Sequence, residues 1–241
     1  MTSEAQQSIT TRPILFSGPM VRAILEGRKT QTRRIVTDKH FKRLGLERDG
    51  DFIYTTDGPL WNGEFEGGRV PWCPYGTVGD RLWVRETWAR VNSECGPGFA
   101  YKADSAFIQP EFDGKNFGAG PSFNYEKYPG DYCMWYSDLV GGADASEGYR
   151  WTPSIHMPRW ASRITLEITG VRVERLNEIS EEDAIAEGVV FGTGKPNECR
   201  TCAKGAFMDL WNAINGADSW MENPWVWRIA FKVIKSQSTG A

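Results

Sequence analysis

Hydrophobic residues along this chain follow two spacings, one typical of helices and one typical of strands. Helical spacing predicts three helices, at residues 20–25, 180–188 and 207–214. Alternation predicts three strands, at residues 82–88, 164–173 and 225–233. Gly170 interrupts the second strand and predicts a bulge or bend there. The mixture predicts an α+β fold, in a single domain over residues 1–241.

Some regions depart from this pattern. Residues 38–68 are polar and glycine-rich, and they predict a surface hairpin or loop. Residues 92–150 form a large insertion rich in glycine and aromatic residues, with short strands expected at 99–103 and 132–136. Its rings can either hold the segment together or stack on bases, and we favour the structural role because loops of this length need their own packing. Residues 236–241 predict a disordered tail.

The composition is that of an ordinary globular protein, with 40% hydrophobic and 24% charged residues in a chain of 241. The first twelve residues contain no apolar run, and nowhere do eighteen apolar residues stand together. We therefore expect a cytoplasmic protein without a membrane segment.

The five cysteines are odd in number and too few to staple a chain of this length, so reduced thiols are expected. Cys199 and Cys202 form a C-x-x-C that could supply half of a zinc site, with Cys73, Cys95 or Cys133 as distant partners. No second C-x-x-C follows, and the only two histidines show no ligand spacing. We expect no metal and no cofactor.

A basic turn, Gly27-Arg28-Lys29-Thr30-Gln31-Thr32-Arg33, follows the first predicted helix. Gly27 suits the left-handed residue that ends a helix. Residues 22–48 contain nine Lys or Arg against three acids, a local charge of +6 in a chain whose net charge is −3. Positive charge concentrated in this way indicates a local function, and the simplest one is phosphate binding.

The pair Lys29 and Thr32 is the best candidate for chemistry. A threonine hydroxyl becomes a nucleophile when a base takes its proton, and a lysine can be that base only when it is neutral. Arg28, Arg33 and Arg34 surround Lys29 with like charge, which lowers the lysine pKa in the required direction.

Two carboxylates stand in unusual positions. Glu86 shares a predicted strand face with three apolar residues, so it is either a structural ion-pair partner of a basic-turn arginine or a functional acid. Glu187 lies in the last turn of the second predicted helix, where the dipole disfavours negative charge. Spacing alone favours a solvated surface glutamate at 187, and Lys29 or a neighbouring arginine is the available partner otherwise.

The basic turn resembles the G-x-K-x-x-x-R signature of ASCH domains, small barrels related to the PUA RNA-binding fold. The Gly79-Asp80 turn, the stretch LNEISEEDAIAEG at residues 176–188 and the closing aromatic strand occur in the order expected of that family. Residues 184–188 and 223–226 are similar to an uncharacterised group of bacteriophage and prophage proteins. The resemblance implies a PUA-like β-barrel with about three helices, carrying the 92–150 insertion.

Within that family, bacterial N4-acetylcytidine amidohydrolases use a lysine as base, a threonine three residues later as nucleophile, and a glutamate on the following helix as proton donor. Matched motif to motif, these roles fall on Lys29, Thr32 and Glu187. The implied function is a hydrolase that removes an acyl group from a modified base such as N4-acylcytidine.

The expected partner is RNA, single-stranded nucleic acid or a modified nucleoside. The residues expected to bind it are Gly27, Arg28, Arg33, Arg34 and Glu86. Other family members resemble ribonucleases or plain RNA binders, so two alternatives stay open. One is a ribonuclease in which Lys29, Arg33 and a carboxylate stabilise the phosphate transition state, and the other is a non-catalytic RNA-binding module.

Overall fold

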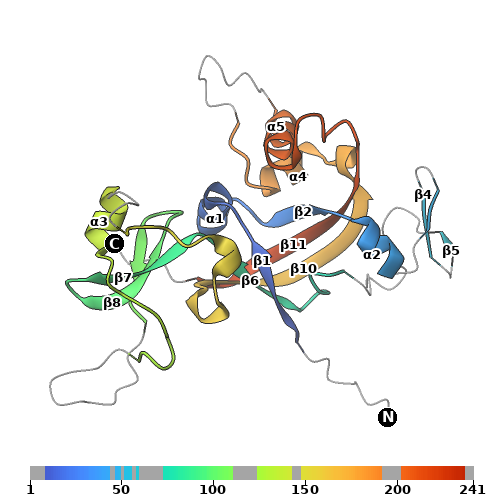
Figure 1. Cartoon of the computed structure of the whole chain (residues 1–241). Helices are drawn as coiled ribbons and strands as arrows, with labels where there is room; N and C mark the ends of the chain where they lie inside the picture. The colour runs from blue at the N-terminus through green and yellow to red at the C-terminus, as the bar shows by residue number, and fades with distance from the viewer. Residues whose placement is uncertain are drawn as a thin grey trace, which may run out of the picture. The chain divides into compact units, whose positions relative to one another are not determined.

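The structure is a computed structural model, and it describes residues 9–43, 47–49, 52–55, 58–59, 73–110, 124–142, 148–191 and 202–236. It confirms the predicted α+β class (Figure 1). The α-helices of the described residues are α1 (Gly18–Leu25), α2 (Asp38–Arg43), α3 (Tyr136–Gly141), α4 (Glu181–Ala186) and α5 (Ala203–Asn215). Short 3₁₀ helices lie at η2 (Ser154–His156), η3 (Arg159–Ala161) and η4 (Leu176–Glu178).

The chain divides into two compact units. Unit 1 comprises Met1–Arg12, Ala23–Leu82 and Leu166–Ile234, and unit 2 comprises Pro13–Arg22, Trp83–Thr165 and Lys235–Ala241. In the part of the chain that is described, no helix is long and apolar enough to cross a membrane.

The described strands form three sheets. The largest has the order β1 (Thr11–Leu15), β6 (Arg81–Arg85), β10 (Ile164–Arg175), β11 (Trp225–Ser236) and β2 (Gln31–Ile35). A second contains β3 (Glu47–Asp49), β4 (Phe52–Thr55) and β5 (Gly58–Pro59), and a third contains β7 (Trp88–Ser93), β8 (Gly96–Tyr101) and β9 (Ala106–Ile108).

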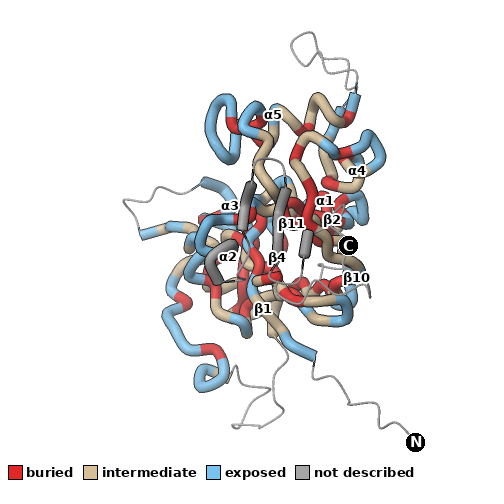
Figure 2. Tube along the Cα trace, turned by 90° about the vertical axis from the view of Figure 1, so that its right-hand side faces the viewer, coloured by how far each residue is buried: buried red, intermediate tan, exposed pale blue. Residues whose placement is uncertain are grey.

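Strand β2 runs antiparallel to β11, and this pairing fixes which residues share a face. Arg33 lies opposite Arg228, and Thr32 lies opposite Ile229. Residues directly opposite in antiparallel strands point to the same side of the sheet, whereas neighbours along one strand point to opposite sides. Both faces of β2 are covered, because Gln31, Thr32 and Arg33 are all buried (Figure 2).

Helices α4 and α5 pack through an apolar cluster in unit 1. Its buried members are Leu176, Ile179, Ala184, Ala203, Phe207, Trp211, Trp220 and Val226. Ser180 caps α4 by accepting a hydrogen bond from the Asp183 N–H, and Cys202 Sγ caps α5 by accepting one from the Gly205 N–H. Apolar burial on one side of each helix therefore fixes α4 beside β11, to which Val226 belongs.

Most of the predicted elements of unit 1 are confirmed. Helices are present at the three predicted places, and β10 and β11 cover the second and third predicted strands. Strand β10 continues through Gly170. Ile185 of α4 and Ile214 of α5 are about half exposed, at 48% and 52%. The region 38–68 contains the expected hairpin, β3 with β4, and also the helix α2, which the polar sequence did not indicate.

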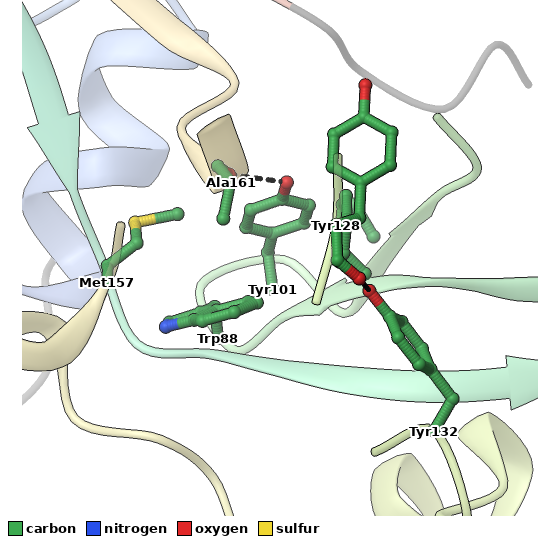
Figure 3. Packing of buried hydrophobic residues seen from close by; sticks show 8 residues of the cluster. Trp88, Tyr101, Tyr128, Tyr132, Met157 and Ala161 are labelled. Carbon is green, nitrogen blue, oxygen red and sulfur yellow. Dashed lines mark hydrogen bonds between the residues drawn. The ribbon is translucent and has the colours of Figure 1, made fainter. Parts of the chain in front are cut away.

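Unit 2 is built around aromatic rings (Figure 3). The buried cluster consists of Trp88, Phe99, Tyr101, Ala106, Tyr128, Tyr132, Met157 and Ala161. The hydroxyl of Tyr101 donates to the Ala161 carbonyl at 2.8 Å, and that of Tyr132 donates to the Tyr128 carbonyl at 2.9 Å (Figure 3). The polar end of each phenol is thus satisfied inside the core, so these rings are used for packing, as we expected for the insertion.

The expected strand at 132–136 is wrong. Trp135 forms only an isolated bridge to Asn92, and the helix α3 begins at Tyr136. Tyr132 is buried in the aromatic cluster. The expected strand at 99–103 is the end of β8. The disordered tail and the thiol of Cys199 lie outside the described residues, apart from Ser236, which ends β11.

Glu86 is buried in unit 2, as alternation along its segment predicted, but the strand expected over residues 82–88 is interrupted there, since β6 ends at Arg85 and β7 begins at Trp88. Its carboxylate accepts two hydrogen bonds from Arg163, Nε to Oε1 at 2.8 Å and an Nη to Oε2 at 2.9 Å. Burial raises the Glu86 pKa, and the Arg163 guanidinium opposes that rise. The same guanidinium bonds Asp104 and lies 4.3 Å from the centre of the Tyr101 ring. Glu86 therefore has a structural arginine partner, which is Arg163.

Removing this arginine tests how far unit 2 depends on the pair. Arg163→Ala leaves Glu86 buried without its cation, so we expect the free energy of unfolding to fall by about 3–5 kcal/mol. Arg159→Ala, a control at an exposed arginine of the same segment, is expected to cost less than about 1 kcal/mol. Urea unfolding of both variants measures the difference. Equal losses would show that the Glu86 pair contributes no more than a surface residue.

Candidate active site

Alternate residues at the start of β2 reach the segment that contains α4. The amide of Gln31 donates to the Asp183 carbonyl at 2.7 Å, and Lys29 and Arg33 both bond Glu187. A period of two along an extended backbone places side chains 29, 31 and 33 on one face. The basic turn is therefore held against the end of α4, 150 or more positions later in the chain.

Lys29 and Glu187 form a buried ion pair. Lys29 Nζ donates to Glu187 Oε2 at 2.7 Å and to the Glu187 carbonyl at 2.9 Å. The two side chains are 0% and 3% exposed. Burial lowers the Lys29 pKa, and Glu187 opposes this as the nearest negative charge. Glu187 is thus no surface glutamate, and its partner is the lysine of the basic turn.

The backbone fixes this pair as firmly as the side chains do. Lys29 and Glu187 form an isolated antiparallel bridge, and the Thr30 N–H donates to the Ala186 carbonyl at 2.9 Å. Gly188 follows with φ +80, and a Cβ on it would lie 2.8 Å from Lys29 Cβ. Only glycine combines that left-handed backbone with so close an approach.

Arg33 uses all three of its guanidinium nitrogens on carboxylates. Nε donates to Glu174 at 2.8 Å, one Nη donates to Glu187 Oε1 at 3.1 Å, and the other donates to Asp183 at 2.7 Å. The side chain is 0% exposed, and the Phe207 ring of α5 lies 6.0 Å from its centre. Lys29 and Arg33 therefore hold the two oxygens of Glu187 from different sides.

Asp183 is shared by three arginines. Arg33 and Arg172 donate to Oδ2 at 2.7 and 3.2 Å, and Arg228 donates to Oδ1 at 2.9 Å. The charge and hydrogen bonds of Arg228 and Arg33 hold the Asp183 pKa below its usual value, although burial alone raises it. Asp183 stays ionised and ties α4 to three strands.

Asp183 and Glu187 are one helical turn apart. The Glu187 N–H donates to the Asp183 carbonyl at 3.0 Å, so the α-helical spacing continues to the end of α4. Residues at i and i+4 of a helix lie on one face, and these two carboxylates therefore meet the same arginine.

Thr32 and Arg34 belong to the opposite face of β2. Thr32 is 2% exposed and is paired with the buried Ile229. Arg34 lies opposite Trp227, and burial lowers the Arg34 pKa while nearby Tyr75 and Glu187 oppose this. Alternation along the strand thus turns the Thr32 side chain away from the face on which Arg33 bonds α4.

The remaining expected binding residues lie near the turn or in unit 2. Gly27 is exposed and ends α1 with φ +75, as expected. Arg28 is exposed, and it donates to the Gly188 carbonyl at 2.9 Å and to Glu26 at 2.7 Å. Glu86 is paired within unit 2, and its bonds to Arg163 account for both carboxylate oxygens.

The described residues contain no group of three or more His, Cys, Asp or Glu side chains that could hold a metal ion. The four thiols that are described, at Cys73, Cys95, Cys133 and Cys202, are free. Burial raises the pKa of Cys73 to about 11, so this thiol is not reactive at neutral pH.

Four residues of the network were not anticipated: Glu174, Asp183, Arg172 and Arg228. Alternation already places Arg172 and Glu174 on the polar face of β10, and Arg228 on the polar face of β11. The sequence does not give the order of the strands, and only arginines on neighbouring strands can bond the same carboxylate.

Gly188 gives a test of the close packing around Lys29. In Gly188→Ala the new methyl group meets Lys29 and Ala23, at 2.8 and 2.9 Å, on a left-handed backbone. Gly27→Ala has a similar φ, but nothing lies within 4 Å of its added Cβ. We expect Gly27→Ala to cost about 1–2 kcal/mol from backbone strain and Gly188→Ala clearly more. Thermal unfolding compares the two variants, and equal losses would contradict the close contact.

Comparison with known proteins returns no match to a family model, to a curated protein or to a solved structure.

Proposed function

We propose that this protein is a hydrolase of the ASCH type, with a PUA-like fold, that removes an acyl group from a modified base such as N4-acylcytidine. The observation that carries the proposal is the buried contact of 2.7 Å between Lys29 Nζ and Glu187 Oε2. This contact joins two of the motif residues: Lys29, a base whose pKa is lowered by burial, and the carboxyl group of Glu187.

One proton shared by this pair can serve both ends of an amide cleavage. The pair holds the same number of protons as Lys29–NH₃⁺ with Glu187–COO⁻ or as neutral amine with carboxylic acid, and burial, which lowers the Lys29 pKa, makes the neutral amine more accessible. In that form Lys29 takes the proton of the nucleophile while Glu187 gives its proton to the departing N4 amine. Transfer from Lys29 to Glu187 across the 2.7 Å contact then restores the starting state.

Arg33 helps to keep the carboxyl group in position. It donates to Glu187 Oε1 and leaves Oε2 to Lys29, so the oxygen that exchanges the proton is defined. Because Lys29 is 1% exposed, a substrate reaches Nζ only when the chain around it opens. Opening exposes the pair to the substrate, and closing buries it again from water.

The nucleophile is either Thr32 or a water molecule. Thr32 is the nucleophile that the resemblance implies, and it would form an ester with the acyl group that water then cleaves. The sheet register turns Thr32 away from Arg33, however, and water activated by Lys29 needs no such side chain. Both routes use the same lysine and glutamate.

The phosphate-based alternatives are supported less well by this geometry. A ribonuclease or an RNA-binding module would present Lys29 and Arg33 to phosphate. Each guanidinium nitrogen of Arg33 already donates to a carboxylate, and neither side chain is exposed. A phosphate would have to displace these carboxylates before either cation could bind it.

Removing either member of the pair tests the proposed reaction. We expect Lys29→Met and Glu187→Gln each to lower kcat/KM for N4-acetylcytidine by about 10²–10⁴-fold, the usual contribution of a positioned acid or base. Lys39→Met, at an exposed lysine, is the control and should leave the rate unchanged. Release of cytidine is followed by liquid chromatography. Wild-type rates in both pair variants would refute the acid–base roles.

Thr32→Val distinguishes the two nucleophiles, since it removes the hydroxyl and keeps the shape of the buried side chain. Loss of deacylation by at least about 10²-fold is expected if Thr32 forms the ester. Retention of the full rate would assign the attack to water. Thr37→Val, at an exposed threonine, provides the matched control. Trapping of an acylated peptide by mass spectrometry gives an independent measure.

The pH dependence follows from the shared proton. At high pH the pair loses that proton, and Glu187 can no longer protonate the leaving amine. Burial lowers the Lys29 pKa from 10.5, so the alkaline loss of kcat/KM should begin below that pH. Between the folded and the ordinary pKa the unfolded chain binds more protons, so the Lys29 contribution to stability rises with pH. Activity that is lost while circular dichroism stays constant supports this titration; an alkaline limb at or above 10.5 contradicts it.

A further inference from the structure

Three arginines lie side by side across three neighbouring strands. Arg33 on β2 is directly opposite Arg228 on β11, and β10, which carries Arg172, is the next strand in the sheet. All three point to the face of α4, because each donates to the Asp183 carboxylate. The row begins beside the Lys29 and Glu187 pair, because Arg33 bonds Glu187. It follows the strand order β2, β11, β10 (Figure 1).

Exposure increases along this row. The Arg33 side chain is 0% exposed, that of Arg228 is 22% exposed and that of Arg172 is 38% exposed. The inner arginine is closed off by carboxylates and by Phe207, whereas the outer two reach the solvent. A ligand bound at the outer two arginines would therefore be adjacent to the buried pair without having to displace it.

The outer arginines have donors to spare. Arg228 donates through one Nη, and its Nε is buried without a hydrogen-bond partner in the described structure. Arg172 uses Nε for Glu174 and one Nη for Asp183. The other Nη of each side chain takes part in none of the hydrogen bonds found within the described residues. A buried unpaired donor on a cation is costly unless an acceptor is supplied.

Charge favours an anionic acceptor at this place. An arginine keeps its charge at any ordinary pH, and three arginines here share two carboxylates, Asp183 and Glu174. Lys29 and Glu187 add no net charge as a pair. Two acids of α4 lie near: Glu181 accepts from the Ala203 N–H at 2.7 Å, and Glu182 is exposed. The four cations of the network exceed the three carboxylates that they bond by one charge, before Glu181 and Glu182 are counted.

We propose that Arg172 and Arg228 form a phosphate subsite, which binds a phosphate of a nucleotide or RNA strand whose base enters the Lys29 and Glu187 site. The inference deepens the proposed function and depends on it for the identity of the base. Planar guanidinium groups with paired N–H donors suit phosphate oxygens. The preferred substrate is accordingly a phosphorylated form of the modified nucleoside.

The subsite is tested with the full chain and the variants Arg172→Gln, Arg228→Gln and their double. Arg33 remains on Asp183 in each variant, so that carboxylate keeps a cation. Arg12→Gln is the matched control, because Arg12 is an ion-paired arginine of unit 1 with a 37% exposed side chain. Circular dichroism establishes that the variants are folded.

The first measurement compares kcat/KM for N4-acetylcytidine, its 5′-monophosphate and a short RNA carrying the same base. The wild type should prefer the phosphorylated substrates, and in each single variant this preference, the ratio of kcat/KM for the phosphorylated form to that for the nucleoside, should fall about tenfold. A loss confined to the RNA would show that the subsite binds a phosphate of the strand. A loss that includes the monophosphate would show that it binds the 5′-phosphate of the nucleotide itself. Equal losses on all three substrates would overturn the subsite.

The second measurement needs no catalysis. Binding of a fluorescein-labelled single-stranded RNA without the modification is followed by anisotropy over a range of salt concentrations. The double variant should bind more weakly and with a shallower salt dependence than the wild type and Arg12→Gln. Weaker binding by the double variant would support the subsite even if the protein removes no acyl group. In that case only the proposed reaction would be rejected. Unchanged affinity and salt dependence in the double variant would overturn the subsite.

Discussion

Desolvation of the Asp183 and Glu187 carboxylates is the constraint on which unit 1 depends. Each is buried or nearly so, and each is stable there because arginine or lysine side chains from β-strands donate to it. Removal of one partner would leave a charge in a medium that solvates it poorly. The apolar cluster around Val226 sets where α4 packs, and the ion pairs set how α4 is rotated about its own axis. Together they give the basic turn a single arrangement.

Local patterns predicted the elements well, because burial on one side repeats with the period of a helix or a strand. The capping residues Ser180 and Gly188 also fixed the ends of α4. Contacts between distant segments were harder: Lys29 and Glu187 are separated by 158 positions, and spacing alone favoured a solvated glutamate. Glu187 was identified by the family resemblance and not by the hydrophobic periodicity. Arg172 and Arg228 could not be grouped without the strand order.

Unit 2 shows how a glycine-rich segment can be ordered by rings. Wide side chains such as Trp88 fill its core. Cations contribute to the same packing, since Arg90 lies 5.0 Å from the centre of Trp88 and 5.3 Å from that of Trp160. In the segment 132–136, where a strand was expected, Tyr132 packs into this cluster, whereas Trp135 is exposed and only bridges Asn92.

The single turn between Asp183 and Glu187 also constrains how this sequence can change. An inserted or deleted residue between them would rotate Glu187 by about 100° around the helix axis, away from Lys29 and Arg33. Substitution of Ala184 or Ile185 by another residue of suitable size leaves the rotation unchanged. In related sequences the number of residues between the two acids should therefore be invariant, even where the residues themselves differ.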